Sequence, residues 1–345
     1  MAHELSIRGD GFVEMAYVGE LPWHGLGNSV PKNAPLREWR VRAGLDWEAK
    51  EAVVQYHNED GLLLPVESKK VLYRSDTSQP VGVVSSGYNV VQPNDLLQSF
   101  RDLVESGGWW IHTAGVLRGG SKLWVMATRS DIDVQSVMPG DKVMPHLLGA
   151  TSLDGSMKST FVLTAVRGVC ANTVGMAIHG AYGSNKIEMS HRSVFNPDLI
   201  KEGLGVAVIS YEEFMEQARR LAQLPIKVSQ ATEVLRDLFG QPTLKDIKPE
   251  HDDYAFQRVM AQFTKTGDQK VREQRSVARC LNLFQGEGLG ADMKGSEGTR
   301  WGLLNAITQH VDHEMGRSND TRMESAWFGR GADIKSQALE VLIEA

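Results

Sequence analysis

The chain has 345 residues, of which 41% are hydrophobic and 23% are charged, and its formal net charge is −6. This composition is ordinary for a globular protein, and its acidity excludes a chain that binds nucleic acid over its whole surface. The length allows a large core and two domains. No run reaches the roughly 18 apolar residues of a spanning helix, and no secretory segment is present near the start. We therefore expect a cytoplasmic protein with no membrane partner, and its two cysteines predict no disulfide framework.

Residues 1–35 are rich in glycine and proline and predict an irregular N-terminal arm. Its Trp23-His24-Gly25 stretch has no role that the sequence reveals. We expect Trp23 and Leu26 to dock on the body of the protein, because large apolar side chains are costly to expose. After this arm, a short helix is predicted over residues 36–43. Short strands are then predicted at 47–56, 62–65, 70–74 and 81–84.

The stretch from Trp109 to Arg167 has the clearest pattern in the chain. A helix beginning at Pro93-Asn94-Asp95 and ending at Gly107-Gly108 precedes it. Tight turns and alternating residues then predict antiparallel strands at 109–117, 122–129, 143–153 and 157–167. A helix is expected over residues 170–178.

From residue 210 onward the apolar spacing becomes helical. Helices are predicted at 211–224, 231–239, 253–264, 272–284, 299–315 and 332–343, with a glycine-rich loop at 286–298. The boundary falls near 190–210. The predicted fold class is α+β, with an antiparallel sheet and packed helices in a domain over 36–195 and a helical domain over 205–345.

Strand alternation separates two faces of the predicted sheet. Lys122, Trp124, Met126 and Thr128 share one face, and Leu123, Val125 and Ala127 share the other. The strand at 157–167 divides in the same way, with Lys158, Thr160, Val162 and Thr164 on its polar face. The apolar face should pack on the helix that begins near Asn94, which leaves the polar face for solvent or a ligand.

Single-stranded nucleic acid needs cations along its phosphates and flat rings for its bases. The candidate nucleic-acid-binding residues are Trp110, Arg118, Lys122, Trp124, Arg129, Lys158, Thr160 and Arg167. The alternative is a solvated sheet face with both tryptophans in the core. Threonine in strands needs no function, because β-branched residues favour strands.

His310 and His313 lie three residues apart on a predicted helix and so share one face. They are candidate ligands of a divalent metal. The zinc-protease pattern His-Glu-x-x-His is absent, and helix packing or capping is the favoured explanation of the pair. We expect no cofactor, with a divalent metal as the open alternative, and no complete set of catalytic residues is evident.

Three stretches of the chain resemble the phage/plasmid-like proteins of unknown function. They are AYVGELPWHGLG at 16–27, VCANT at 169–173 and WGLLNAITQHVDH at 301–313. The resemblance spans nearly the whole chain and implies a protein of phages, plasmids or integrated elements, but it implies no activity. A second resemblance is topological: hairpins over 109–167 followed by a helix are similar to the core of single-strand annealing recombinases.

The leading hypothesis is therefore a non-enzymatic protein that binds and anneals single-stranded DNA in recombination or replication of a mobile element. Copies side by side, as a homo-oligomeric ring or filament, would extend one groove along the DNA. One alternative is a metal-dependent nuclease that uses His310 and His313. The other is a phage binding module that antagonises a host protein.

Overall fold

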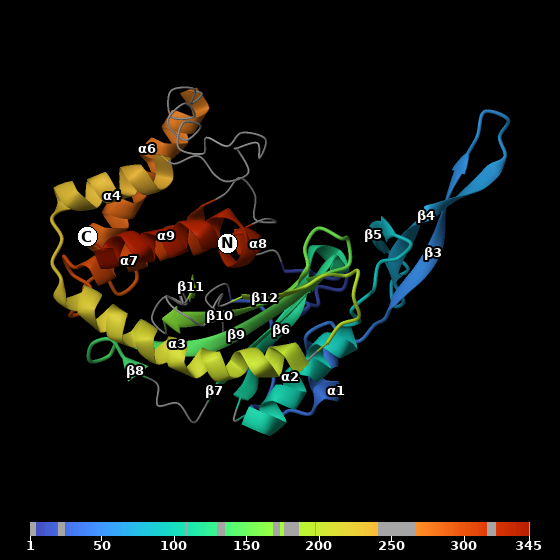
Figure 1. Ribbon diagram of the computed structural model, residues 1–345, viewed down its shortest axis with the longest axis horizontal. Coiled ribbons are helices and arrows are strands. Elements are labelled where there is room, and N and C mark those ends of the chain that lie inside the picture. The colour runs from blue at the N-terminus through green and yellow to red at the C-terminus, as the bar shows by residue number, and fades with distance from the viewer. Residues whose placement is uncertain are drawn as a thin grey trace.

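The computed structural model describes residues 5–19, 25–107, 109–129, 135–167, 173–175, 186–196, 198–240, 267–315 and 322–344. Helices and antiparallel sheets are combined in one chain, so the predicted α+β class is confirmed. Figure 1 shows a large sheet with helices on both sides and a narrow arm that projects from this body. None of the helices in the described ranges is long and apolar enough to cross a membrane.

The large sheet is built around the strands that the sequence predicts between Trp109 and Arg167. Its nine strands run in the order β11-β10-β9-β7-β6-β1-β2, with β8 beside β9 and β12 beside β10. They are β1 (Met15–Tyr17), β2 (Asn28–Ser29), β6 (Trp109–Leu117), β7 (Lys122–Arg129), β8 (Gln135–Ser136), β9 (Lys142–Ser152), β10 (Ser159–Arg167), β11 (Thr173–Gly175) and β12 (Lys186–Met189). The four predicted strands are confirmed as the antiparallel neighbours β6, β7, β9 and β10.

Two expectations about the ends of this sheet are corrected. The helix predicted over 170–178 is wrong at Thr173–Gly175, which form β11 along β10, because β-branched residues fit the exposed edge of a strand. The rest of that segment lies outside the described residues. The N-terminal arm is not wholly irregular, since β1 pairs with β6 and β2 pairs with β1. Leu26 packs on the body as expected, whereas Trp23 lies outside the described residues.

Three helices cover the apolar face of the large sheet. They are α1 (Leu36–Arg42), α2 (Pro93–Gly107) and α3 (Asp198–Gln223). Leu123, Val125 and Ala127 are fully buried in one cluster with Phe100 of α2, as the sequence predicts. Gly149 of β9 allows the close approach, because a Cβ atom there would lie 2.6 Å from the ring of Phe100.

The C-terminal helices pack on the sheet and continue its core. They are α4 (Val228–Gly240), α6 (Gly267–Asn282), α7 (Arg300–Gln309), α8 (Arg322–Phe328) and α9 (Arg330–Glu344), with π-helical turns η3 (Leu283–Glu287) and η4 (His310–Glu314). The helices predicted at 211–224, 231–239, 272–284, 299–315 and 332–343 are confirmed, and the one at 253–264 lies outside the described residues. Thr299 caps α7 by accepting from the amide of Gly302 at 3.1 Å. One hydrophobic cluster contains Val125 of the sheet and Leu304 of α7, so the core crosses the boundary predicted near 190–210.

A second, three-stranded sheet forms the projecting arm. Its strands are β3 (Ala49–His57), β4 (Leu63–Arg74) and β5 (Pro80–Ser85), in the order β3-β4-β5. The strands predicted separately at 62–65 and 70–74 are therefore one strand, β4. We call residues 49–74 the arm, and Figure 1 shows its turn pointing away from the body.

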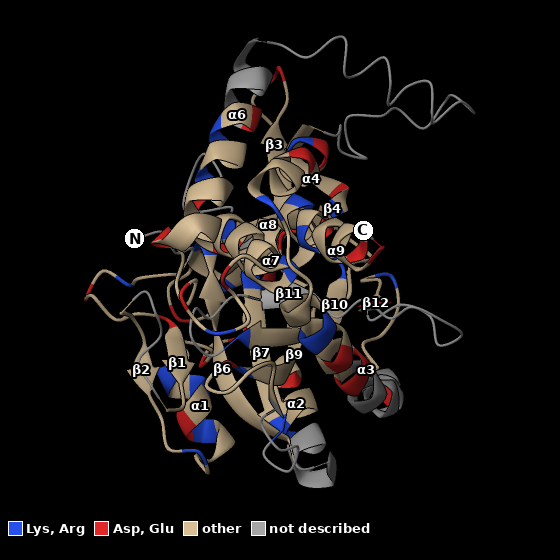
Figure 2. Cartoon of the chain, turned by 90° about the vertical axis from the view of Figure 1, so that its left-hand side faces the viewer, with Lys and Arg blue, Asp and Glu red and all other residues tan. Residues whose placement is uncertain are grey.

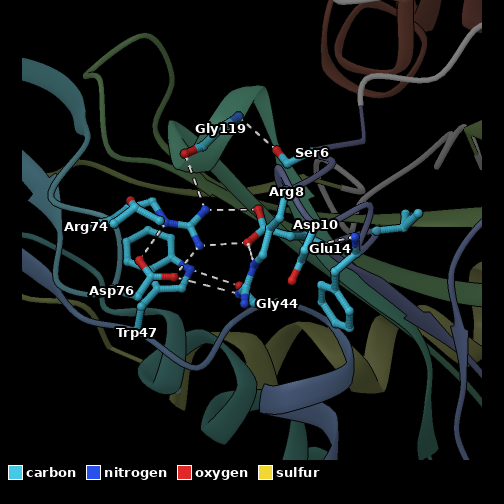
Figure 3. Close-up of polar contacts among 12 residues, drawn as sticks. Ser6, Arg8, Asp10, Glu14, Gly44, Trp47, Arg74, Asp76 and Gly119 are labelled. Carbon is cyan, nitrogen blue, oxygen red and sulfur yellow. Dashed lines mark hydrogen bonds and ion pairs between the residues drawn. The ribbon is translucent and has the colours of Figure 1, made fainter.

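The base of the arm is held by a buried cluster of charges (Figure 3). The guanidinium of Arg74 donates to Glu14 at 2.7 and 2.9 Å and to Asp76 at 2.8 and 3.0 Å. It also lies over the Trp47 ring, 4.4 Å from the centroid. Burial opposes the charge of Arg74, but the hydrogen bonds to Asp76 and Glu14 outweigh it and raise its pKa. The arm is therefore fixed to β1 and its neighbours.

A second buried ion pair ties the sheet to the C-terminal half. Arg167 at the end of β10 donates to both oxygens of Asp141, at 2.6 and 2.8 Å. Both side chains are 1% exposed. Trp301 donates its indole N–H to Asp141 at 2.8 Å, and Arg167 also donates to Ser296 at 2.9 Å. Side chains from both halves of the chain thus share one set of charge-assisted hydrogen bonds.

Asp141→Asn tests this ion pair. The substitution keeps the shape of the side chain but leaves the Arg167 charge buried without its counterion. We expect the free energy of unfolding to fall by about 3–5 kcal/mol, as for other broken buried pairs, measured by urea denaturation. The control is Glu188→Gln, whose partner Lys158 has a side chain that is 58% exposed, and it should cost less than about 1 kcal/mol. Equal losses in the two variants would contradict the role of the pair.

Candidate nucleic-acid interface

The protein itself covers the polar face of the large sheet. The prediction that this face is open to solvent or a ligand is therefore wrong at the centre of the sheet. Trp124 is 2% exposed and lies in a cluster with Met15, Tyr17 and Trp327. The rings of Trp124 and Trp327 are 5.3 Å apart. Alternation along a strand shows which side chains share a face, but it does not show which distant segment covers that face. Here Trp327 of α8 packs on Trp124, and Met15 and Tyr17 of the neighbouring strand β1 extend the same buried cluster.

Three further candidates are buried as well. Lys122 is 2% exposed, Thr160 is 3% exposed and Arg167 is 1% exposed. The Thr160 hydroxyl donates to the carbonyl of Lys158 at 3.1 Å, and Arg167 belongs to the ion pair with Asp141. These side chains cannot reach a DNA strand while the protein keeps this fold.

The other candidates lie at the surface but apart from one another. Arg118 is exposed in the turn η1 (Arg118–Gly120) between β6 and β7. Arg129 is partly exposed at the opposite end of the same strand pair, where it is the partner of Trp109. Lys158 is exposed and pairs with Glu188 at 2.8 Å. The structure therefore does not bring the predicted residues together into one groove.

Trp110 is the one predicted aromatic residue that keeps a partly exposed position. Lys32, from the loop between β2 and α1, lies over its ring with the ammonium nitrogen 4.8 Å from the centroid. This distance is that of a cation–π contact. Arg129 is the direct partner of Trp109, the residue before Trp110, so its side chain points to the other face of the strand pair. We call Lys32, Trp110 and His112 the Trp110 rim.

A pair of histidines continues the rim into the sheet. His112 sits at a bulge in β6, and its ring packs edge-on against Trp110 at 5.4 Å. Its Nδ1 lies 2.9 Å from Nε2 of His146, and Nδ1 of His146 lies 3.2 Å from the carbonyl of Met144. Because a carbonyl only accepts, His146 carries its proton on Nδ1 and accepts from His112 through Nε2. His112 then keeps a lone pair on its own Nε2.

Both histidines are neutral at physiological pH. Burial lowers the pKa of His112 from 6.5 to about 4. Burial, with the neighbouring His112, lowers the pKa of His146 to about 3. The sequence analysis missed this pair, although both residues lie in predicted strands. The signal is the strand register, which places His146 opposite Thr128 and Thr128 opposite Trp110.

The metal candidates His310 and His313 lie in η4. Nδ1 of His310 is 3.3 Å from Glu314 and Nε2 is 3.1 Å from Ser276, so both ring nitrogens have a partner. Burial lowers the pKa of His310, although Glu314 opposes the shift. Within the part of the chain that the structure describes, no three His, Cys, Asp or Glu side chains are grouped to hold a metal ion.

Charges on the helices are mixed rather than grouped by sign. Figure 2 shows basic and acidic residues interspersed along α6, α4, α9 and α3. A polyanion is attracted most strongly by a continuous basic surface. Among the predicted nucleic-acid-binding residues, Trp110 is the ring that lies beside an exposed cation, Lys32.

The family described as "Domain of unknown function (DUF932)" matches residues 80–327. No curated protein and no solved structure is matched by the chain. The family match begins at the first residue of β5 and covers the large sheet from β6 onward and most of the C-terminal helices. The strands β3 and β4 of the arm lie outside it.

The histidine pair predicts a loss of stability in acid. The pKa of each histidine is lower in the folded protein than the ordinary 6.5, so the unfolded chain binds more protons below that value. Stability is then complete above about pH 6.5 and falls as the pH drops, by up to about 1.4 kcal/mol per pH unit for each histidine. Urea denaturation between about pH 7 and pH 5 measures this slope.

His112→Asn removes one titrating group and keeps a donor for His146, so we expect a smaller slope. The same slope in His112→Asn and the unsubstituted protein would contradict the assignment.

Proposed function

The chain belongs to the family described as a domain of unknown function, DUF932, and we propose from its own geometry that it is a non-enzymatic single-stranded DNA-binding and annealing protein. It would act in recombination or replication of a phage or plasmid. The observation that carries the proposal is the stacked pair of Lys32 and Trp110 at the rim of the large sheet. The origin in a mobile element rests on the stretches at 16–27, 169–173 and 301–313.

The Trp110 rim has the groups that a single strand needs. An indole offers a surface on which a base of any sequence stacks, worth about 1–3 kcal/mol per base. Lys32 is exposed beside it and would contact a phosphate. Neutral His112 offers a hydrogen-bond acceptor to a base edge. The buried residues Lys122, Trp124, Thr160 and Arg167 take no part in this proposal.

One rim holds few nucleotides, so the proposed function needs several copies. When copies bind one strand side by side, the second contact is intramolecular and the affinities multiply. A small site with few charges then suffices for a stable complex. This fits a chain whose net charge is −6, because only the rim has to face the DNA.

The two alternative functions that the sequence suggests have different support. For a metal-dependent nuclease, His310 would have to leave both Glu314 and Ser276 before it could bind a metal, so no observation favours that use. A phage module that binds a host protein stays a prediction. Binding to single-stranded DNA separates it from our proposal.

The test is titration of a fluorescently labelled oligothymidine with the full chain. Trp110→Ala should weaken binding by roughly 10-fold or more, because it removes a stacking partner. Trp110→Phe should retain most of the affinity, since it keeps an aromatic face. Lys32→Ala should reduce the slope of log affinity against log salt by about 1.

Lys227→Ala is the matched control, because Lys227 is exposed between α3 and α4, away from the rim. It should leave both the affinity and the salt slope unchanged. Thermal unfolding checks that each variant is folded. If Trp110→Ala and Lys227→Ala bind DNA equally well, or if the unsubstituted protein binds none, the proposed function is wrong.

A further inference from the structure

Three polar side chains form a continuous chain of hydrogen bonds where α6 meets η4. Nε2 of His310 lies 3.1 Å from the hydroxyl oxygen of Ser276, and Nδ1 of His310 lies 3.3 Å from a carboxylate oxygen of Glu314. A serine, a histidine and a carboxylate linked in this order match a nucleophile, its base and the group that orients the base. Such a set is recognised by its geometry and not by its order in the sequence.

The protons along this chain are arranged in the way that activates a serine. Burial opposes the charge of Glu314, but hydrogen bonds from Arg279 and His310 outweigh it and lower its pKa. The ionised carboxylate only accepts, so Nδ1 of His310 carries a proton. Burial lowers the pKa of His310, so its ring is neutral and Nε2 has a lone pair. Nε2 therefore accepts from the Ser276 hydroxyl, as a general base does.

The surrounding structure holds the histidine in this orientation. The amide of Met315 donates to the carbonyl of His310 at 2.7 Å, which is the bond that defines a π-helical turn. Such turns are rare and occur frequently at functional sites. His310 is 7% exposed, and the ring of Phe239 in α4 packs edge-on against it at 5.8 Å. A base that is already fixed needs little reorganisation during a reaction.

The serine is the accessible end of the chain of hydrogen bonds. Ser276 is partly exposed in α6, whereas His310 is buried behind it. A substrate therefore reaches the hydroxyl from solvent and finds the base on the protein side. Because Phe239 closes the far side of the histidine, the acyl group of such a substrate has to be small.

Arg279 provides hydrogen-bond donors beside the serine. It lies three residues further along α6, so it faces the same side as Ser276, and its side chain is 37% exposed. Hydrogen bonds to Glu314 and Glu287 use three of the five N–H donors of its guanidinium. The others can donate to a substrate oxygen that becomes negative. The two glutamates balance the charge of Arg279, so the site does not select a strongly charged substrate.

We propose that Ser276, His310 and Glu314 form a nucleophilic site that hydrolyses small, uncharged carboxylic esters. The Ser276 oxygen bonds to the carbonyl carbon of the ester, and its proton passes to Nε2 of His310. The bond from that carbon to the alcohol oxygen then breaks, and His310 gives the proton to this leaving oxygen. Water, activated by the same histidine, attacks the acyl-serine and releases the acid.

This activity goes beyond the proposed DNA binding and does not depend on it. The site is built from α6 and η4, whereas Trp110 belongs to β6, which lies apart from α6 in Figure 1. A result at Ser276 therefore leaves the proposed function untouched, and a result at Trp110 leaves this site untouched.

The test treats the full chain with a fluorophosphonate and locates the labelled peptide by mass spectrometry. The Ser276 oxygen should bond to phosphorus with loss of fluoride, and the protein should hydrolyse p-nitrophenyl acetate. Ser276→Ala should lose both reactions. His310→Gln should slow labelling by about 100-fold or more, because help from a general base is typically worth that much.

Glu314 is a positioning residue, so its variant needs a second measurement. Burial lowers the pKa of His310, Glu314 raises it, and Arg279 and Arg322 lower it further. Glu314→Gln removes the contribution that raises this pKa. The variant should therefore label more slowly, and the pH at which its labelling is half-maximal should be lower than in the unsubstituted protein.

Two control variants leave the chain of hydrogen bonds intact. Glu287→Gln removes a carboxylate that binds Arg279, and Ser229→Ala removes an exposed serine of α4. Both should be labelled at Ser276 at the unsubstituted rate, and thermal unfolding checks that each variant is folded. The proposal is overturned if the unsubstituted protein is not labelled at Ser276 or does not hydrolyse the ester. Labelling of His310→Gln at the unsubstituted rate, or of Ser229 as readily as Ser276, would overturn it as well.

Discussion

The ion pair between Arg167 and Asp141 is the interaction on which the arrangement of the two halves depends. Two charges at 1% exposure are stable only when they satisfy each other and their remaining hydrogen bonds. Trp301 and Ser296 supply those bonds from the C-terminal half. The end of β10 is thereby fixed to the start of α7, and α8 and α9 follow in the chain. Trp327 of α8 then lies on Trp124 and covers the polar face of the sheet.

Because α8 covers this face, the polar residues in the strands bond within the protein and do not face a ligand. Thr128 donates to the carbonyl of Pro145 at 2.7 Å, and the hydroxyls of Thr151 and Ser159 are 2.8 Å apart. Buried hydroxyls need such partners, and here they find them within the sheet. The alternation of Lys, Thr and Trp is therefore the pattern of a sheet that is packed on both faces. At the Trp110 rim, by contrast, a ring and a cation stay near solvent.

The rim and the arm are separate parts of the structure with different surfaces. The rim has a cation beside an aromatic face, whereas the arm exposes apolar side chains. The cluster around Arg74 lies between them in the structure, since it joins the arm to β1, which pairs with β6, the strand of Trp110.

The sequence by itself determined the α+β class, the four central strands and most of the helices. These follow from local rules: alternation at 122–129, tight turns between the strands, and helical spacing from residue 210 onward. It also determined that the apolar side of the sheet would pack on the helix that begins near Asn94. The tertiary structure alone decided that Lys122 and Arg167 are buried, that 173–175 is an edge strand, and that His112 meets His146. Each of these outcomes depends on which distant segments of the chain pack together. That packing is set by the strand register and by the buried ion pairs, and no local sequence pattern specifies either of them.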